Sequence, residues 1–376
     1  MATGFVLRRL GWIGHAGPMV SRRALTWAAT ISSEMQSRPA TAVYDYLSPT
    51  PSQLLSTSLS DFVPPPAAAA AAADAQDVGW TRPLPPGHHL VYFPLPLPPS
   101  RLLADGTDPG HSPGPAFSRR LWAGGSVVFS PDSQRTLRLD GRRAVCVESI
   151  GDVVAKPAGA NGDSPDAKVF VDVWRRYGLV NAEQAGAAAE DEVGRRPAIE
   201  ERRTLVFMKL PPATPSPGRV AADTRRVRGE SLIRLGGRAW GVTSRLPVPH
   251  APDFSFTLTP SPTLLFHFSA LTFNAHAIHL DRRFCREVEG HRGLLVHGPL
   301  SLTLLLAALR SQLAPGEEVR RIDYRNLVPL YADEPMKVCV RRSGVAAGPE
   351  KSWDVWAEGP TGGFAVRATA STSSGT

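Results

Sequence analysis

The feature that most constrains the fold is one almost entirely apolar segment in the second half of the chain. Residues 300–309 contain only two polar side chains, Ser301 and Thr303. Gly298 is placed to act as the N-cap, and Pro299 suits the first helical position, where a missing N–H costs nothing. A helix that is apolar on nearly every side is buried rather than amphipathic. The segment therefore predicts a helix through the middle of a core.

The residues just ahead of this helix are rich in histidine. Five of the ten histidines lie between residues 266 and 309, namely His267, His276, His279, His291 and His297. The first amides of a helix have no partners within it, and they favour negative charge. A buried helix that begins at a polar, histidine-rich loop is therefore predicted to form an anion-stabilising site.

Several motifs in this region point to a known family. They are H-x-D at residues 279–281, E-G at 289–290, L-V-H-G-P-L at 295–300 and F-S-A-L-T-F-N-A-H-A-I-H at 268–279. Together they resemble the MaoC-like (R)-specific hydratase/dehydratase family. Within it, the chain is most similar to the fungal mitochondrial hydroxyacyl-thioester dehydratases type 2 and to the mesaconyl-C4-CoA hydratases. The likeness covers most of residues 75–370.

The resemblance implies an α+β chain with a double hot-dog fold, in which each antiparallel sheet wraps around a central helix. Short strands at close spacing agree with such sheets. The first half shows no comparably clear central helix, so that helix is expected to be degenerate. Strands are predicted at residues 119–129, 135–139, 143–152, 169–177, 203–210, 254–258, 263–269, 319–327, 336–341, 352–358 and 363–370. A short helix is predicted at residues 43–59.

Four regions are predicted along the chain. Residues 1–40 are expected to be a mitochondrial transit peptide leading to the matrix, because the first 33 residues carry four arginines and no acidic residue. Residues 41–212 are expected to form an N-terminal hot-dog-like domain on the acyl-chain side. A linker at 213–250 follows, and 251–372 form the C-terminal, MaoC-like catalytic domain. Residues 229–249 show no clear periodicity.

The catalytic motif of the (R)-specific hydratases, D-x-N-P-[LIV]-H, falls on residues 274–279 with changes. The resemblance retains the histidine as His279, whereas Asn274 stands at the aspartate position and His276 at the asparagine position. An amide cannot take up a proton. We therefore expect His279 to be the main acid/base and Asn274 to position a water or the substrate hydroxyl. Either His276 or Asp281 is the second proton carrier; otherwise His276 is a loop histidine and Asp281 a helix cap.

Dehydration of a 3-hydroxyacyl thioester needs proton carriers and amides aimed at the developing oxyanion. The backbone N–H of Gly298 is the candidate donor, helped by the partial positive charge at the helix N-terminus. His297 either hydrogen-bonds the loop or fixes its turn. Four arginines beside the loop either meet the phosphates of a pantetheine carrier or form a solvated helix face: Arg282, Arg283, Arg286 and Arg292. The resemblance also places Tyr324 and Asn326 at the pantetheine tunnel.

Bulk composition narrows the function classes. The net charge is +8, but the arginines are scattered rather than gathered with aromatic residues, which argues against nucleic-acid binding. The three cysteines lack metal-ligand spacing, and no metal or cofactor is expected. No apolar run reaches the roughly 20 residues needed to span a bilayer.

The leading hypothesis is a (3R)-3-hydroxyacyl thioester dehydratase that forms trans-2-enoyl thioesters in mitochondrial fatty acid synthesis. The resemblance implies an acyl carrier protein or CoA thioester as substrate. One alternative is a hydratase of a short dicarboxylyl-CoA such as mesaconyl-CoA, and another is a non-catalytic acyl-thioester binding protein. The expected assembly is either a monomeric double hot dog or a homodimer.

Overall fold

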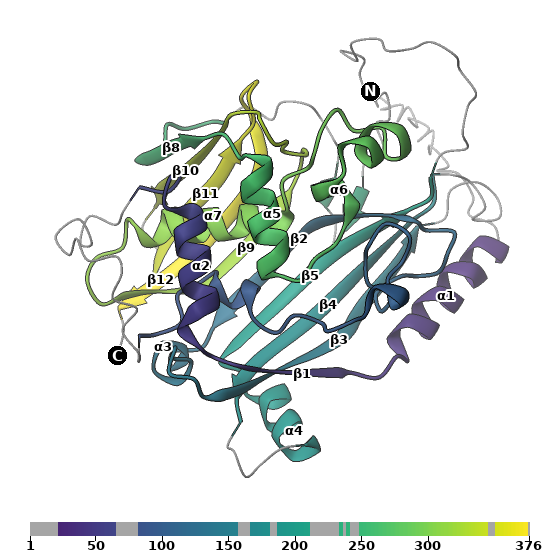
Figure 1. The fold of residues 1–376 in the computed structure, drawn as a ribbon, viewed down its shortest axis with the longest axis horizontal. Coiled ribbons are helices and arrows are strands. Elements are labelled where there is room, and N and C mark those ends of the chain that lie inside the picture. The colour runs from purple at the N-terminus through teal and green to yellow at the C-terminus, as the bar shows by residue number, and fades with distance from the viewer. Residues whose placement is uncertain are drawn as a thin grey trace, which may run out of the picture.

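The computed structural model describes residues 22–64, 82–156, 166–180, 186–210, 233–235, 238–240, 248–344 and 350–374. Ten of its strands form one antiparallel sheet in the order β1-β3-β4-β5-β2-β9-β12-β11-β10-β8 (Figure 1). The first five are β1 (Thr41–Tyr46), β2 (Arg119–Phe129), β3 (Arg143–Lys156), β4 (Lys168–Leu179) and β5 (Ile199–Met208). The others are β8 (Phe254–Leu258), β9 (Glu317–Asn326), β10 (Met336–Ser343), β11 (Lys351–Glu358) and β12 (Phe364–Ser374).

The sheet consists of two halves with the same topology. The first half runs β1-β3-β4-β5-β2, and the second runs β8-β10-β11-β12-β9. In each half, the first strand in the chain lies at the outer edge and the second lies at the junction, with the third, fourth and fifth between them in order. The halves meet where β2 pairs with β9, with Gly124 opposite Arg325 and Val128 opposite Arg321. This repeat confirms the predicted double hot-dog arrangement and its α+β class.

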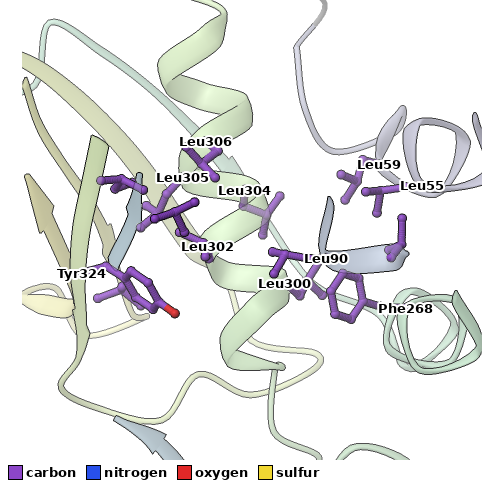
Figure 2. Close-up of a cluster of buried hydrophobic side chains, with 14 of the residues drawn as sticks. Leu55, Leu59, Leu90, Phe268, Leu300, Leu302, Leu304, Leu305, Leu306 and Tyr324 are labelled. Carbon is purple, nitrogen blue, oxygen red and sulfur yellow. The ribbon is translucent and has the colours of Figure 1, made fainter. Parts of the chain in front are cut away.

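The central helix of the second half is α7 (Gly298–Arg310), and residues 300–309 are all buried or nearly so. In Figure 2, Leu302 lies on the side of α7 that faces the strand of Tyr324, while Leu300 points toward Leu90 and Phe268. Both sides of the helix are therefore covered, which explains why its sequence is apolar all round. The helix begins at Gly298, so its N-cap is His297, one residue earlier than predicted.

The matching element of the first half is only a 3₁₀ turn, η1 (His88–Val91), in which every residue is buried. It lies against α7: a Cβ added at Gly87 would be 3.4 Å from Leu306. Each half also carries one helix after its first strand, α2 (Pro49–Leu59) and α5 (Pro262–Leu271), and the two pack side by side (Figure 1). The central helix of the first half is thus reduced to a single turn, as predicted.

Some element predictions were wrong. The predicted strand at 263–269 is part of α5, where Pro262 occupies the first turn and the Ser261 hydroxyl accepts the Leu264 N–H at 3.1 Å. This capping signal outweighs the β-like composition. The predicted helix at 43–59 divides into β1 and α2. The predicted strand at 135–139 overlaps the short helix α3 (Ser133–Thr136).

Smaller elements complete the fold. They are η2 (Pro99–Arg101), α4 (Ala187–Arg195), α6 (Ala277–Leu280) and the π-helical turn η3 (Phe284–Val288). Within the predicted linker, β6 (Ile233–Leu235) pairs with β7 (Arg238–Trp240). Residues 211–232 and 241–247 lie outside the described residues. Among the helices described, none is both long and apolar enough to cross a membrane.

Helix α1 (Arg22–Gln36) lies within the predicted transit peptide, yet it packs against β3 at the edge of the sheet (Figure 1). Met35 is fully buried in a cluster with Phe117 and Val169. Residues 22–36 are therefore packed into the fold. Residues 1–21 lie outside the described residues.

A substitution at Met35 tests whether α1 stabilises the protein. Met35→Ala should lower the free energy of unfolding by about 2–5 kcal/mol, because it empties a fully buried site. Leu25→Ala on the same helix is the matched control, since Leu25 is 57% exposed. Urea denaturation of the full chain measures both variants. Equal stability of the two variants would mean that α1 does not contribute to the core.

Candidate active site

A cavity of about 850 Å³ lies between the two halves of the molecule. Its walls come from within residues 90–102, 106–111, 120–123, 148–175 and 203–208 of the first half and 266–280, 295–301, 326–330 and 366 of the second. Most of the lining side chains are apolar, and the polar ones gather in two places: around the start of α7 with the loop at 274–279, and on a charged wall from the first half. The site therefore belongs to neither half alone.

His279 lies on this cavity with its protonation state fixed by its surroundings. Its Nδ1 is 2.8 Å from the carbonyl oxygen of Leu295, so Nδ1 carries the hydrogen and donates it. Burial lowers the pKa of His279 to about 4. The ring is consequently neutral at pH 7, and Nε2 keeps a free lone pair. This is the protonation state that a general base requires.

His297 packs against the His279 ring and lies outside the cavity lining. The two rings stack with centroids 3.7 Å apart and planes 22° apart. His297 is fully buried, does not line the cavity, and holds Nε2 2.9 Å from the Ser269 hydroxyl. Stacking and this hydrogen bond fix both rings. Its observed contacts favour the predicted role in fixing the loop over contact with substrate.

Asn274 and His276 lie next to His279 on the cavity wall. The Asn274 side-chain oxygen accepts the backbone N–H of His276 at 3.0 Å. The His276 ring stands edge-on to His279, with centroids 5.4 Å apart. Burial lowers the pKa of His276 well below its usual value, and the nearby His279 and Arg120 lower it further. Both histidines are thus neutral at rest.

Gly298 places the first amide of α7 on the cavity wall. A Cβ at this position would lie 2.9 Å from Cβ of Trp122, which comes from β2 in the other half. Only glycine allows this approach. The N–H groups of the first turn have no acceptors within the helix, so they are available to a ligand. The predicted oxyanion donor therefore lies on the wall of the same cavity that His279 lines.

The two polar residues predicted at the tunnel differ in position. Asn326 lines the cavity, and its side-chain N–H₂ donates to the Trp122 carbonyl at 2.8 Å. Tyr324 is buried instead, and its hydroxyl accepts the indole N–H of Trp122 at 2.8 Å without lining the cavity. Both residues brace Trp122, which in turn packs on Gly298.

Asp281 and the four arginines lie away from the cavity lining. The exposed Asp281 carboxylate accepts the backbone N–H groups of Arg283 and Phe284 at 2.8 and 3.0 Å, so it caps the turn η3. Three of the arginines pair with carboxylates: Arg282 with Asp333, Arg283 with Glu287, and Arg292 with Glu334. Arg286 donates to the Arg292 carbonyl at 3.3 Å. These contacts agree with the cap and the solvated face considered for these residues.

Sequence reasoning missed a charged wall that the first half contributes to the cavity. His111 lies 2.8 Å from a Glu148 oxygen and 3.3 Å from an Asp108 oxygen, with Arg120 and Arg175 nearby on the same wall. Although burial opposes the charge, Glu148 and Asp108 raise the pKa of His111 to about 9. The run D-G-T-D-P-G-H at residues 105–111 holds part of this wall, but its turn residues alone indicated only a loop.

The buried neutral histidines predict a pH dependence of stability. Burial holds the pKa of both His279 and His89 at about 4, against about 6.5 in an unfolded chain. The unfolded chain therefore binds more protons between these values, and stability falls as the pH falls from 6.5 toward 4. Each histidine should cost roughly 2 kcal/mol at pH 5. Chemical denaturation at pH 7 and pH 5 measures this loss. It should shrink in a His279→Gln variant, and equal stability at the two pH values would contradict it.

Comparison with known proteins identifies the family. A model of the hydroxyacyl-thioester dehydratase type 2 family matches residues 87–232 and 241–332, which is more than half of the chain. The protein belongs to this family. The resemblance read from the sequence motifs is thereby confirmed.

Two curated relatives match across most of their length. The mitochondrial hydroxyacyl-thioester dehydratase type 2 of Schizosaccharomyces pombe is 26% identical over 305 residues, which are 80% of this chain and 89% of the relative. The mesaconyl-C(4)-CoA hydratase of Chloroflexus aurantiacus is 28% identical over 291 residues, which are 76% of this chain and 83% of the relative. This chain is thus similar to both kinds of enzyme that the sequence motifs suggested.

Solved structures support the fold. A MaoC-like dehydratase from Phytophthora capsici superposes with a TM-score of 0.54 at 14% identity, covering 91% of this chain and 97% of its own. A second MaoC-like dehydratase gives 0.55 at 14% identity, with 90% and 98% covered. The fold is therefore shared with those proteins over nearly their whole length.

Proposed function

We propose that the protein catalyses the reversible dehydration of (3R)-3-hydroxyacyl thioesters to trans-2-enoyl thioesters. The observation that carries this proposal is the placement of His279 on the cavity beside the first amide of α7, with its Nδ1 bonded to Leu295. A neutral base and an oxyanion donor face the same space. Membership of the hydroxyacyl-thioester dehydratase type 2 family supports the same reaction.

In the proposed dehydration, Nε2 of His279 takes the proton from C2 of the thioester. The negative charge that develops on the thioester oxygen is stabilised by the Gly298 N–H and the positive end of α7. The C3–O bond then breaks, and the imidazolium of His279 returns its proton to the departing oxygen to form water. Asn274 and His276 hold that oxygen. Each step starts from the neutral histidines that burial favours, and hydration is the reverse.

This scheme needs only one histidine for both proton transfers. A second proton carrier at His276 stays a prediction, since that residue lines the cavity. Asp281 does not fit this role, because its carboxylate caps η3 outside the cavity lining.

The charged wall favours a second candidate substrate. Arg120 and Arg175 line the cavity, where they pair with Asp108 and Glu148, and a dicarboxylyl group such as the mesaconyl group carries a carboxylate that a buried guanidinium binds well. The apolar remainder of the lining suits a fatty acyl chain instead. The two candidates share the same bond chemistry and differ in the acyl group.

Hydration assays with the purified full chain separate these candidates. We expect kcat/KM for trans-2-octenoyl thioesters to exceed that for mesaconyl-CoA. The reverse order would select the dicarboxylyl hydratase, and turnover of neither by a folded protein that still binds thioesters would select the non-catalytic binding protein. Offering each acyl group on acyl carrier protein and on CoA identifies the carrier, for which we propose acyl carrier protein.

We also propose a mitochondrial location, in the matrix, with the targeting signal confined to residues before Arg22. The fission yeast relative is a mitochondrial protein by name, and α1 packs on the sheet rather than lying free. A fluorescent fusion of residues 1–21 should enter mitochondria, and a cytosolic signal would contradict this.

The β2–β9 pairing joins the two hot-dog units within one chain, so we propose that the protein is a monomer. Sedimentation of the purified protein as a homodimer would contradict this.

A further inference from the structure

The first half of the chain supplies a carboxylate to a site where the second half lacks one. We propose that Asp105, in the loop after η2, is the positioning residue that orients His276 toward the oxygen added to or removed from C3. This inference rests on the proposed function. In the family motif an aspartate stands where this chain has Asn274, and the inference assigns that missing carboxylate to Asp105 of the first half.

The first observation is that Asn274 is occupied by a structural contact. Its side-chain oxygen accepts the His276 N–H at 3.0 Å, which shapes the backbone of the loop. The second is that a carboxylate oxygen of Asp105 lies 3.5 Å from Nε2 of His276. Both side chains are buried, with Asp105 only 8% exposed. A carboxylate in so dry a place is stabilised only by groups that donate to it.

The Asp105 carboxylate is held in one orientation. Its other oxygen accepts the backbone N–H of Thr107 at 3.0 Å and the Thr107 hydroxyl at 2.5 Å. This leaves the other oxygen, which lies 3.5 Å from Nε2 of His276, free to move closer and accept Nε2–H. A carboxylate bonded to one ring nitrogen fixes the tautomer of a histidine and leaves the opposite nitrogen as an acceptor. In His276 that opposite nitrogen is Nδ1.

The loop itself is docked against the motif. The carbonyl oxygen of Asp105 accepts the backbone N–H of Ala277 at 2.8 Å. Gly106 has φ +80°, and a Cβ there would lie 2.1 Å from the carbonyl oxygen of Ala275. Only glycine permits so close an approach of the two backbones. The loop of the first half and the catalytic loop of the second half therefore form one unit.

The chemistry of the pair follows from these contacts. The charged and titratable groups that act on His276 are Arg120, His279 and His291, besides Asp105. In hydration, Nδ1 of His276 accepts one hydrogen of the attacking water, while the other proton of that water passes to Nε2 of His279. The water oxygen bonds to C3, and His279 then delivers the proton to C2. Asp105 takes up no proton and does not touch the substrate.

The test replaces the carboxylate by an amide of the same size. Asp105→Asn should lower kcat roughly 10–100-fold, as expected for loss of a partner that orients a functional histidine, with a much smaller change in KM. The matched comparison is Asp281→Asn, the same change at the acid that caps η3, which should keep the wild-type kcat. A larger loss in Asp281→Asn than in Asp105→Asn would overturn the proposal.

A double variant shows whether Asp105 acts through His276. Once His276→Gln has removed the ring, adding Asp105→Asn should cause no further loss of kcat, because coupled residues are not additive. A full additional loss would mean that Asp105 only supports the loop. Thermal melts of all variants confirm that the proteins compared are folded.

A measurement without turnover separates this proposal from the proposed function. ¹⁵N chemical shifts of His276 report which ring nitrogen carries the hydrogen. We expect Nε2–H in the wild type and a shift toward Nδ1–H in Asp105→Asn. An unchanged tautomer overturns the role of Asp105 even if the enzyme is an active dehydratase. Conversely, the expected change supports it even if none of the assayed thioesters is the substrate.

Discussion

Replacing His279 by glutamine should lower kcat by about 10²–10⁴-fold, the usual contribution of a positioned acid/base. Glutamine keeps a donor for the Leu295 carbonyl, which His279 bonds at 2.8 Å, but it has no nitrogen that can take up the C2 proton. Because the oxyanion donor and the cavity remain, KM should change much less than kcat. Steady-state hydration of a trans-2-enoyl thioester measures both quantities.

His267→Gln is the matched control for this substitution. His267 lies on the exposed side of α5, near the Ser58 hydroxyl at 3.3 Å and outside the cavity lining. It should therefore keep wild-type kcat. A folded His279→Gln protein with undiminished kcat would show that another residue is the base.

Gly298→Ala is expected to have the second-largest effect, because one methyl group disturbs two features at once. The added Cβ would lie 2.9 Å from Cβ of Trp122, an atom fixed to the backbone of β2. Either β2 or the start of α7 must shift. Overpacking of this kind costs about 1–3 kcal/mol of stability. A displaced helix N-terminus also misdirects the oxyanion donor, which should cost about 10²–10³-fold in kcat.

Gly293→Ala tests whether any glycine near the site has this effect. A Cβ at Gly293 would meet only a ring carbon of Tyr331 at 4.0 Å, which is an ordinary contact. Both kcat and the free energy of unfolding should therefore stay close to wild type. Similar losses in the two variants would mean that Gly298 matters through general packing, and not through the amide of α7.

The parts of the fold and site that local sequence predicted share a common property. Helix α7 was predictable because residues 300–309 are almost all apolar, which indicates a buried helix, and because Pro299 suits its first turn. His279 was predictable because it keeps its place in a short motif beside that helix. The two-halved sheet followed from the family resemblance and from strands of short, regular spacing. The first two signals lie within short stretches of chain, whereas the third extends over most of residues 75–370.

The parts that were missed depend on contacts between distant segments. Asp105 lies 3.5 Å from His276 although 171 positions separate them in the chain, and no pattern around either residue announces the contact. Arg120 likewise acts on the distant His276. Trp122 contacts Gly298 from the other half of the molecule. Helix α5 was mistaken for a strand because its apolar residues outweighed the capping serine, Ser261. For the four arginines beside the loop, the sequence left open both phosphate contact and a solvated face, and three of them pair with carboxylates in the structure.

The central claim is that His279 carries the proton to and from C2 in a site built from both halves. Hydration of a trans-2-enoyl thioester in D₂O, followed by mass spectrometry and chiral analysis, tests it most directly. The wild-type protein should yield the (3R)-3-hydroxyacyl thioester with one deuterium at C2, and folded His279→Gln should form this product about 10²–10⁴-fold more slowly. Undiminished deuterium incorporation by His279→Gln, or a (3S) product from the wild type, would contradict the account.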